Sequence, residues 1–221
     1  MEAAGGEAPP AKLQTVLVIF DCDGVLVDSE PLANSELAAM LTDLGLPTTR
    51  EESMAAFMGR AWDSITPLIE ARLQAPLPEG FIDTYYERVF AAFDRELQPV
   101  EGIQAALDAI EALGHETCVA SSGPHKRIRK TLTKTGLIHR FPEARIFSAQ
   151  DVKQGKPAPD LFLNAITTLG YDSNEAVVIE DAPTGVRAAR AAGIRVLGYR
   201  TPADATFTRM QDLPGLLAAP R

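Results

Sequence analysis

The chain has 221 residues, of which 46% are hydrophobic and 23% are charged, and its 30 acidic and 21 basic side chains give a formal net charge of −9. This composition argues against a disordered chain, and the negative charge argues against nucleic acid or an anionic membrane as a partner. No apolar run approaches the length of a membrane-spanning helix, so we expect no membrane partner.

The first twelve residues, MEAAGGEAPPAK, contain acids, alanines, glycines and prolines but no apolar segment. They predict a loose tail over residues 1–12 rather than a secretory signal. Cys22 and Cys118 both fall in expected buried strands, so we interpret them as reduced and expect a cytoplasmic protein. We also expect a monomer or a weak homodimer.

Residues 15–20 are apolar or β-branched, which predicts a strand buried on both faces of a parallel sheet. The run ends at Asp21, and Asp23 and Gly24 follow after one residue. If the strand stays extended, both carboxylates project to the same side, at the strand end where open α/β sheets bind ligands. Asp-x-Asp-Gly also suits an ordinary turn, and this stretch by itself does not exclude that interpretation.

The next stretch predicts helices only, over residues 31–44, 49–58, 62–74 and 79–97. Gly45 is a stop signal for the first helix, and Thr49 with Glu52 resembles a capping box for the second. A βαβ crossover needs only about a dozen residues, so four helices in a row form an insert. Because the insert leaves the chain just after Asp23, it is a candidate lid over the strand end.

From residue 98 the pattern alternates between helix, glycine and strand. Expected helices cover residues 102–113, 125–135, 159–169 and 183–192, and expected strands cover 116–120, 145–148, 176–179 and 194–199. This pattern predicts an α/β fold with a doubly wound parallel sheet, a Rossmann-like core. The core domain would comprise residues 13–30 and 98–221, and residues 31–97 would form an inserted four-helix cap domain. Residues 207–221 should add one short packed segment.

Acidic side chains follow two of the expected strands. Because the ends of parallel strands converge, we expect Asp21, Asp23, Glu180 and Asp181 to meet in one cleft. Four carboxylates would repel one another unless a cation lies among them, and oxygen ligands favour Mg²⁺. Acids ahead of Pro183 can also cap a helix, which remains the alternative for Glu180 and Asp181.

A serine and a lysine complete the set of candidate groups. Ser121 ends one expected strand, and Lys156 lies in a loop just before a helix. Each is ordinary alone, because such lysines are often solvated and a serine before glycine often forms a turn. With the acids they supply a fixed positive charge and a hydroxyl donor near a metal, which predicts phosphoryl transfer through a carboxylate.

Four segments in this order, FDCDGVLVDSE, VASSG, GKPAPD and VIEDAPTGVRAARAAG, resemble the motifs of the haloacid dehalogenase-like hydrolase superfamily, in its branch with a helical cap. The resemblance spans residues 16–199. It implies that Asp21 is a nucleophile that forms an aspartyl-phosphate, and that Asp23 is the general acid and then the general base. The backbone carbonyl of Asp23, rather than its carboxylate, would bind the metal.

The same resemblance implies roles for the remaining groups. Ser121 would hold a phosphate oxygen, and Lys156 would bridge the nucleophile and the phosphoryl group. Asp181 would bind Mg²⁺ directly, with Glu180 in support. These implied roles agree with the chemistry expected from the residue types.

Substrate contacts are expected from the cap and from the loop after Ser121. The break at Gly59 and Arg60 falls where related enzymes bring a cap loop to the site, so Arg60 would meet a sugar hydroxyl, a carboxylate or a second anionic group, unless it is a surface arginine. Further candidates border the expected phosphate pocket: Ser122, Gly123, His125 and Lys126.

The other basic and histidine side chains are expected to have no such role. Arg127, Arg129 and Lys130 are read as a solvated helix face. His115 and His139 are read as surface or helix-end residues.

The expected function is a Mg²⁺-dependent phosphatase for a small phosphorylated metabolite, such as a sugar phosphate or phosphogluconate. The alternative is a mutase, because β-phosphoglucomutases are also similar. Those enzymes carry a histidine five positions after the last aspartate of the first motif, and here Ala33 stands there, counted from Asp28. A dehalogenase is disfavoured because its chemistry needs neither Asp23 nor the metal acids, and a non-enzymatic role because all the implied catalytic groups are present.

Overall fold

A computed structural model describes residues 15–58, 60 and 62–218, and the expected tail over residues 1–12 lies outside them. Within the described part, six parallel strands form one sheet in the order β3-β2-β1-β4-β5-β6. The strands are β1 (Leu17–Phe20), β2 (Glu116–Ser121), β3 (Ile146–Ser148), β4 (Ala176–Glu180), β5 (Arg195–Tyr199) and β6 (Ala205–Phe207). The first strand of the chain is therefore a central strand, between β2 and β4.

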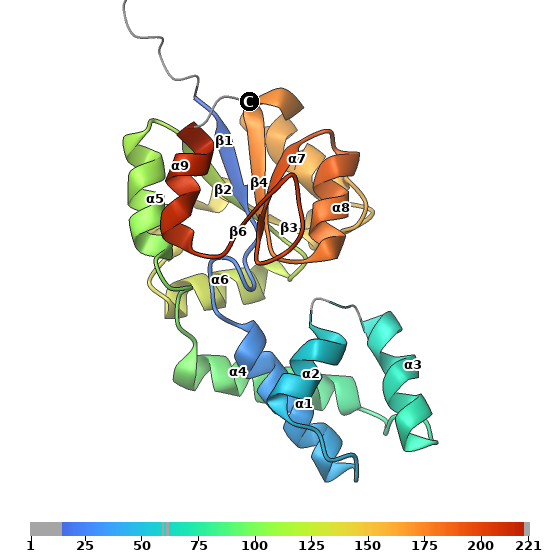
Figure 1. Ribbon diagram of the computed structural model, residues 1–221. Coiled ribbons are helices and arrows are strands. Elements are labelled where there is room, and N and C mark those ends of the chain that lie inside the picture. Colours follow the sequence, from blue (N-terminus) through green and yellow to red (C-terminus); the bar gives the residue numbers. More distant parts are fainter. Residues whose placement is uncertain (1–14, 59, 61, 219–221) are drawn as a thin grey trace, which may run out of the picture.

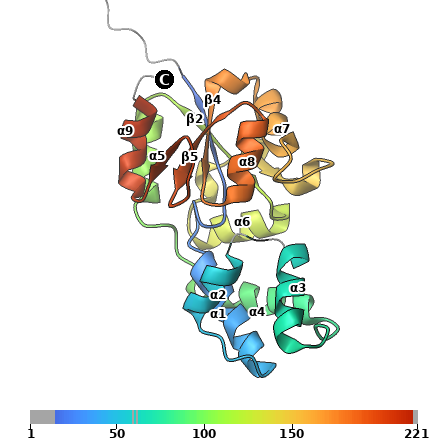
Figure 2. The same ribbon diagram turned by 45° about the vertical axis from the view of Figure 1, so that its right-hand side comes forward.

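Helices cover both faces of this sheet (Figures 1 and 2). The side chains of Leu17 and Ile19 belong to one apolar core, and those of Val18 and Phe20 belong to the other. All four are fully buried, as the unbroken apolar run of β1 predicted. The covering helices are α5 (Ile103–Ala112), α6 (His125–Lys134) and α9 (Leu213–Ala218) on the Val18 side, and α7 (Asp160–Leu169) and α8 (Pro183–Ala191) on the other. The doubly wound α/β fold is confirmed.

A helical insert follows β1, as expected, and lies beyond one end of the sheet (Figure 1). Its helices are α1 (Glu30–Asp43), α2 (Arg50–Phe57), α3 (Trp62–Leu73) and α4 (Phe81–Glu96). They share an apolar cluster of their own, which includes Leu41 and Ile69. The capping box before α2 is present, because Thr49 Oγ1 accepts from the backbone N–H of Glu52 and Glu52 Oε2 accepts from that of Thr49.

The two connections between the sheet and the insert run side by side. Val27 forms an antiparallel bridge with Pro99. The backbone N–H of Asp28 donates to the Gln98 carbonyl at 3.0 Å, and that of Val100 donates to the Leu26 carbonyl, also at 3.0 Å. The helical cap is thus tied to the core by a short two-stranded link. The expected domain limits at residues 30 and 98 remain a prediction.

Strand β6 was not expected, because Ala205–Phe207 has a single buried side chain, at Phe207, and follows β5 with no helix between them. His115 lies just after the end of α5, as the helix-end expectation has it, but it is not at the surface: it is 6% exposed, and its Nδ1 accepts from the Val16 N–H at 3.4 Å. His139 is exposed, as expected.

Short 3₁₀ helices occupy several connections: η1 (Ile138–Arg140), η2 (Glu143–Arg145), η3 (Ala149–Asp151), η4 (Ser173–Glu175) and η5 (Met210–Asp212). Among the described residues, none of the helices has the length and apolar character needed to cross a bilayer.

Candidate active site

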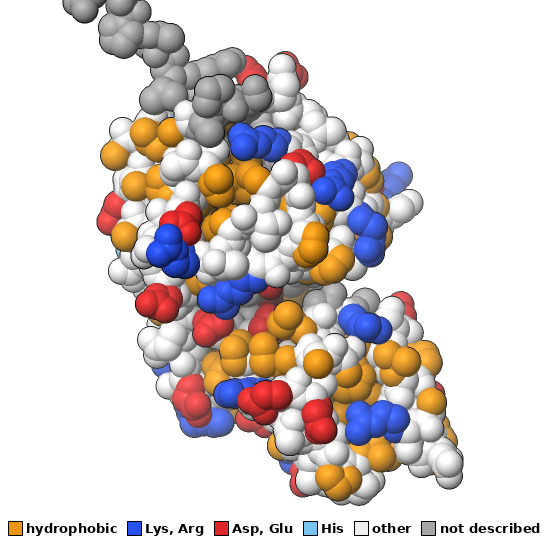
Figure 3. Space-filling model, viewed as in Figure 1, with side chains coloured by type: hydrophobic (Ala, Val, Ile, Leu, Met, Phe, Trp, Pro, Cys, Tyr) orange, Lys and Arg blue, Asp and Glu red, His pale blue; other side chains and the backbone are white. Residues whose placement is uncertain are grey.

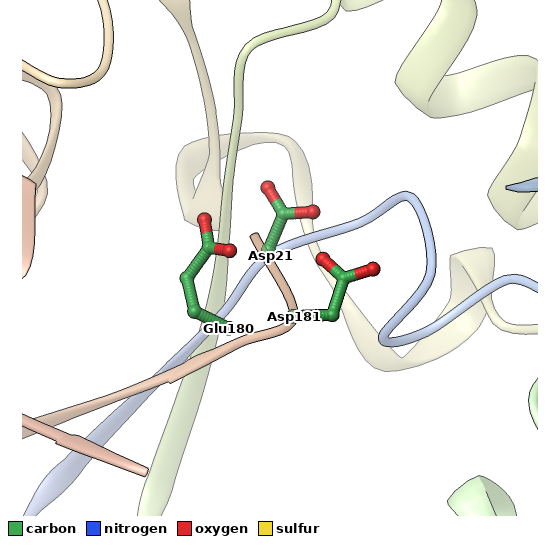
Figure 4. Close-up of side chains that lie close together, drawn as sticks. All are labelled: Asp21, Glu180 and Asp181. Carbon is green, nitrogen blue, oxygen red and sulfur yellow. The ribbon is translucent and has the colours of Figure 1, made fainter. Parts of the chain in front are cut away.

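Three carboxylates gather at the carboxyl ends of the two central strands. Asp21 directly follows β1, and its N–H continues the sheet by donating to the Ile179 carbonyl of β4 at 3.0 Å. Because Phe20 pairs with Ile179, the residues that follow each of them, Asp21 and Glu180, lie next to each other. Asp181 comes next, and oxygens of the three carboxylates lie within 4.8 Å of one another. Figure 4 shows the three side chains projecting to the same side of the strands.

Lys156 links two of these carboxylates. Its Nζ donates to Asp21 Oδ1 at 2.6 Å and to Glu180 Oε1 at 2.7 Å. The Lys156 side chain is only 3% exposed and also lies 5.0 Å from the ring centre of Phe162. The lysine is therefore an internal counter-charge rather than a solvated loop residue.

One ammonium group does not balance these three acids, of which Asp21 and Glu180 are buried and Asp181 is partly buried. Burial raises the pKa of Asp21 to about 7, with Lys156 lowering it and Glu180 raising it further. Burial, followed by the charges of Asp21 and Glu180, also raises the pKa of Asp181 well above its ordinary value. A cation among the oxygens would reverse both effects. The excess negative charge and the all-oxygen donor set therefore fit a hard divalent ion such as Mg²⁺.

Two glycines make room for the acids. A Cβ at Gly24, whose φ is +79°, would lie 2.0 Å from Asp181 Oδ2. A Cβ at Gly185 in α8 would lie 1.7 Å from Glu180 Oε1. Since real Cβ atoms do not approach so closely, both positions require glycine for the carboxylates to keep their places.

We expect Gly185→Ala to damage the site while leaving the fold intact. Alanine favours the helix by about 1 kcal/mol over glycine, but here its Cβ displaces Glu180 and so removes a partner of Lys156. Affinity for Mg²⁺ should weaken about 10- to 100-fold, as for other groups that orient metal ligands. Calorimetric titration with Mg²⁺ checks this, with Gly215→Ala in α9 as the control because no atom of another part of the chain lies within 4 Å of its new Cβ. Wild-type affinity for Mg²⁺ in Gly185→Ala would contradict it.

Asp23 does not join the three other acids, which corrects the expectation that four carboxylates converge. Its Oδ1 instead accepts from Arg127 Nη2 at 2.9 Å. The expectation assumed an extended strand through Asp23, but β1 ends at Phe20 and the chain turns at Gly24. Asp23 forms an isolated bridge with Val27 in that turn, so its side chain no longer follows the strand alternation.

Arg127 is the site residue that sequence reasoning missed. It was assigned to a solvated face, yet its side chain is only 17% exposed. Arg129 and Lys130 do behave as expected, since they form exposed pairs with Glu143 and Asp94. Helical spacing could have indicated that Arg127 faces inward, because it lies one turn before Thr131, which is fully buried.

The other candidates lie at the end of β2, in the loop that follows it and at the start of α6. Ser121 ends β2 and is 1% exposed, and its Oγ accepts from the Gly123 N–H at 3.1 Å. The ring of His125 instead pairs with Asp151 Oδ1 at 2.8 Å. Ser122 and Lys126 are exposed. The expected contact at Gly59 lies outside the described residues.

Comparisons with known proteins agree with this geometry. The family model described as "Haloacid dehalogenase-like hydrolase" matches residues 18–199. The chain belongs to this family. This result confirms the expected family and the expectation of a phosphoric monoester hydrolase.

Three similar proteins show how far the likeness extends. The chain is 29% identical to 6-phosphogluconate phosphatase of Escherichia coli strain K12, over 91% of this chain and 94% of that protein. It is 32% identical to hexitol phosphatase A of the same strain, over 88% of each. A crystal structure of a haloacid dehalogenase-like protein of unknown function from Agrobacterium tumefaciens superposes with a TM-score of 0.84 at 33% identity, covering 92% of this chain and 98% of that one.

In this haloacid dehalogenase-like hydrolase, a pocket of about 290 Å³ opens between the cap helices and α6. Its walls carry acidic, basic, amide and aromatic side chains, among them Glu30, Asn34, Arg60, Trp62, Tyr85, Tyr86 and Arg127. Figure 3 shows charged side chains of both signs where the helical insert meets the part of the molecule that contains the sheet. Arg60 is exposed and is one of the residues that line this pocket.

Proposed function

We propose that the chain is a Mg²⁺-dependent phosphatase that hydrolyses a small phosphorylated sugar or sugar acid through an aspartyl-phosphate on Asp21. The observation that carries this proposal is the pair of short contacts from Lys156 to Asp21 and Glu180, beside Asp181. A buried carboxylate held by an ammonium group, next to excess acids, suits attack on a phosphate whose charge a bound cation would offset.

The metal would be held by the carboxylates of Asp21 and Asp181 and by the backbone carbonyl of Asp23. Glu180 would support the site by holding Lys156, with which it already forms a hydrogen bond. When bound, Mg²⁺ would neutralise charge on the phosphoryl oxygens during transfer.

Side chains of the protein carry out the reaction in two displacement steps. A carboxylate oxygen of Asp21 attacks phosphorus, the bond to the substrate oxygen breaks, and Asp23 gives its proton to that oxygen. Asp23 then takes a proton from water, which attacks the aspartyl-phosphate and releases phosphate. Lys156 offsets the negative charge of Asp21 and the phosphoryl group, and the hydroxyl of Ser121 donates to a phosphate oxygen.

The pocket supports a substrate with several hydroxyl groups. Glu30 and Asn34 are joined by a hydrogen bond of 3.2 Å, and Ser53 donates to Asn34 Oδ1 at 2.9 Å, which fixes polar groups in the wall. Trp62 and Tyr85 form an edge-to-face pair that offers apolar surface to sugar C–H groups. Two similar proteins are named for 6-phosphogluconate and for hexitol phosphates, which fits the same substrate class.

Other substrate contacts remain part of the proposal. We propose that Arg60 meets a hydroxyl or carboxylate of the substrate. The remaining candidates would border the phosphate: Gly59, Ser122, Gly123, His125 and Lys126. We propose that the enzyme is a monomer or a weak homodimer in the cytoplasm, where its two free, buried cysteines would stay reduced.

The direct test is phosphate release from a panel of phosphomonoesters. With Mg²⁺ we expect the highest kcat/KM for phosphorylated sugar acids or sugar alcohols, and slower release from p-nitrophenyl phosphate. Removal of the metal with EDTA should reduce the rate to background, and added Mg²⁺ should restore it. No release from any panel member in the presence of Mg²⁺ would refute the proposal.

A second measurement separates hydrolase from mutase. Ala33 lines the pocket and offers no acid–base group there, which favours transfer to water. With β-glucose 1-phosphate and glucose 1,6-bisphosphate we therefore expect free phosphate to form faster than glucose 6-phosphate. The reverse order would establish the mutase reaction instead.

A further inference from the structure

Arg127 enters the cleft from the first turn of α6, directly after the loop that follows β2. Its alkyl chain passes close to Gly123, where a Cβ would lie 3.5 Å from Arg127 Cδ. The side chain is mostly buried, although it belongs to a run of basic residues. A buried arginine is costly unless its charge has a partner, so its surroundings indicate its role.

The Arg127 guanidinium touches both halves of the molecule. On the core side, Nη2 donates to Asp23 Oδ1 at 2.9 Å. On the cap side, the guanidinium carbon lies 5.6 Å from the ring centre of Phe93, a buried residue of α4. The same side chain lines the pocket together with Glu30 and Tyr85. Arg127 therefore connects the general-acid candidate to the last cap helix.

The charges around Asp23 explain why it needs a fixed partner. Asp21, Glu180 and Asp181 offer three carboxyl groups beside the single ammonium group of Lys156. Once Asp23 has given up its proton, its carboxylate would be repelled by these acids, and the guanidinium of Arg127 offsets that repulsion. Burial lowers the pKa of Arg127, but the charge of Asp23 and their hydrogen bond raise it above its ordinary value, so the arginine is always charged.

The bond to Arg127 also orients the carboxylate of Asp23. Only Oδ1 receives a hydrogen bond from the guanidinium, and the contact is single rather than forked. Within the described residues, Arg127 Nε is buried without a hydrogen-bond partner, so the guanidinium is placed by Asp23 and Phe93 rather than by a full set of bonds. The second oxygen of Asp23 is left for proton transfer.

We propose that Arg127 is a positioning residue of the phosphatase reaction: it holds Asp23 through Oδ1, so that the other oxygen meets the leaving group, and its contact with Phe93 ties this orientation to α4. The inference rests on the proposed function, in which Asp23 is the general acid. Arg129 and Lys130, on the same helix, do not hold Asp23: they pair with the exposed acids Glu143 and Asp94, although Asp94 also belongs to α4.

A series of substituted phenyl phosphates tests the inference. Their shapes are similar, but proton donation matters more as the leaving phenol becomes a poorer leaving group. For Arg127→Gln we expect kcat/KM to fall by about 10²-fold with 4-methoxyphenyl phosphate and by less than about 10-fold with 4-nitrophenyl phosphate. The ratio of the two losses does not depend on the folded fraction of the sample. An equal loss across the series would overturn the inference.

A double-mutant cycle with Asp23→Asn tests whether Arg127 acts through Asp23. In that background Arg127→Gln should change kcat/KM by less than about 2-fold, because the two losses are not additive when one residue serves the other. Additive losses would overturn the inference and indicate direct substrate binding. Arg127→Lys should recover part of the activity with 4-methoxyphenyl phosphate, since it keeps the charge near Asp23.

Arg129→Gln is the matched control, because it removes the same charge two residues further along α6 from an exposed pair. It should retain wild-type kcat/KM across the series, and thermal unfolding should show both variants folded. If wild-type enzyme released no phosphate from any substrate, the proposed function would fail and the inference with it. If the wild type is active and Arg127→Gln shows the same dependence of kcat/KM on the leaving group as the wild type, only the inference fails.

Discussion

Asp21→Asn should abolish phosphate release, with kcat falling by at least about 10⁴-fold, because the amide cannot form the covalent intermediate. The amide oxygen can still accept the hydrogen bond that Lys156 donates to Asp21. A continuous phosphate assay measures the loss. Acid quenching with labelled substrate should trap label on the wild type and none on the variant.

The same substitution should not unfold the enzyme. Burial raises the pKa of Asp21, so the fold disfavours the ionised side chain, and a neutral amide relieves repulsion from Glu180. We expect an unchanged or higher Tm for Asp21→Asn in the absence of metal. Wild-type turnover by this folded variant would remove Asp21 from the role of nucleophile.

Asp23→Asn should lower kcat by about 10²- to 10⁴-fold, the usual range for a lost proton-transfer group. Mg²⁺ binding should persist, because the proposed metal ligand of Asp23 is its backbone carbonyl, which the substitution keeps. The loss should be greater for alkyl phosphates than for p-nitrophenyl phosphate, whose leaving group needs little protonation. Steady-state kinetics and calorimetric titration with Mg²⁺ measure the two effects.

The control for Asp23→Asn is Glu87→Gln, the same acid-to-amide change on the exposed face of α4. It should leave kcat and Mg²⁺ binding at wild-type values. Asp23→Asn itself should cost about 1–3 kcal/mol of unfolding free energy, since it weakens a charged hydrogen bond to the mostly buried Arg127. Loss of Mg²⁺ affinity in Asp23→Asn would contradict the carbonyl-ligand role.

Local patterns were sufficient to predict most of the fold. The apolar run before Asp21 predicted a strand buried on both faces of a parallel sheet, and the repeated helix, glycine and strand predicted the doubly wound sheet. Those elements recur in a regular order, so that even β3, with only three residues, was expected in its place. Strand β6 is only three residues long, and its place depends on pairing with β5, which no local pattern reports.

The candidate site was predictable where backbone direction decides the position of a side chain. Asp21, Glu180 and Asp181 come together because β1 and β4 are parallel neighbours. The pairing of Asp23 with Arg127 was not predicted, because it joins a turn to a helix more than a hundred residues later in the chain. Charge alone made Arg127 resemble Arg129, and only the fold distinguishes them, through the bond to Asp23 and the packing against Phe93.

The bridge between Val27 and Pro99 has an evolutionary consequence. The two ends of the insert lie next to each other, so the entropy of closing that loop depends only weakly on the length of the chain between them. Helices of a different length or sequence could replace the present ones without moving Asp21 or Lys156. Under the proposed function, selection can therefore change which metabolite is recognised while the groups proposed to break the phosphate ester stay in place.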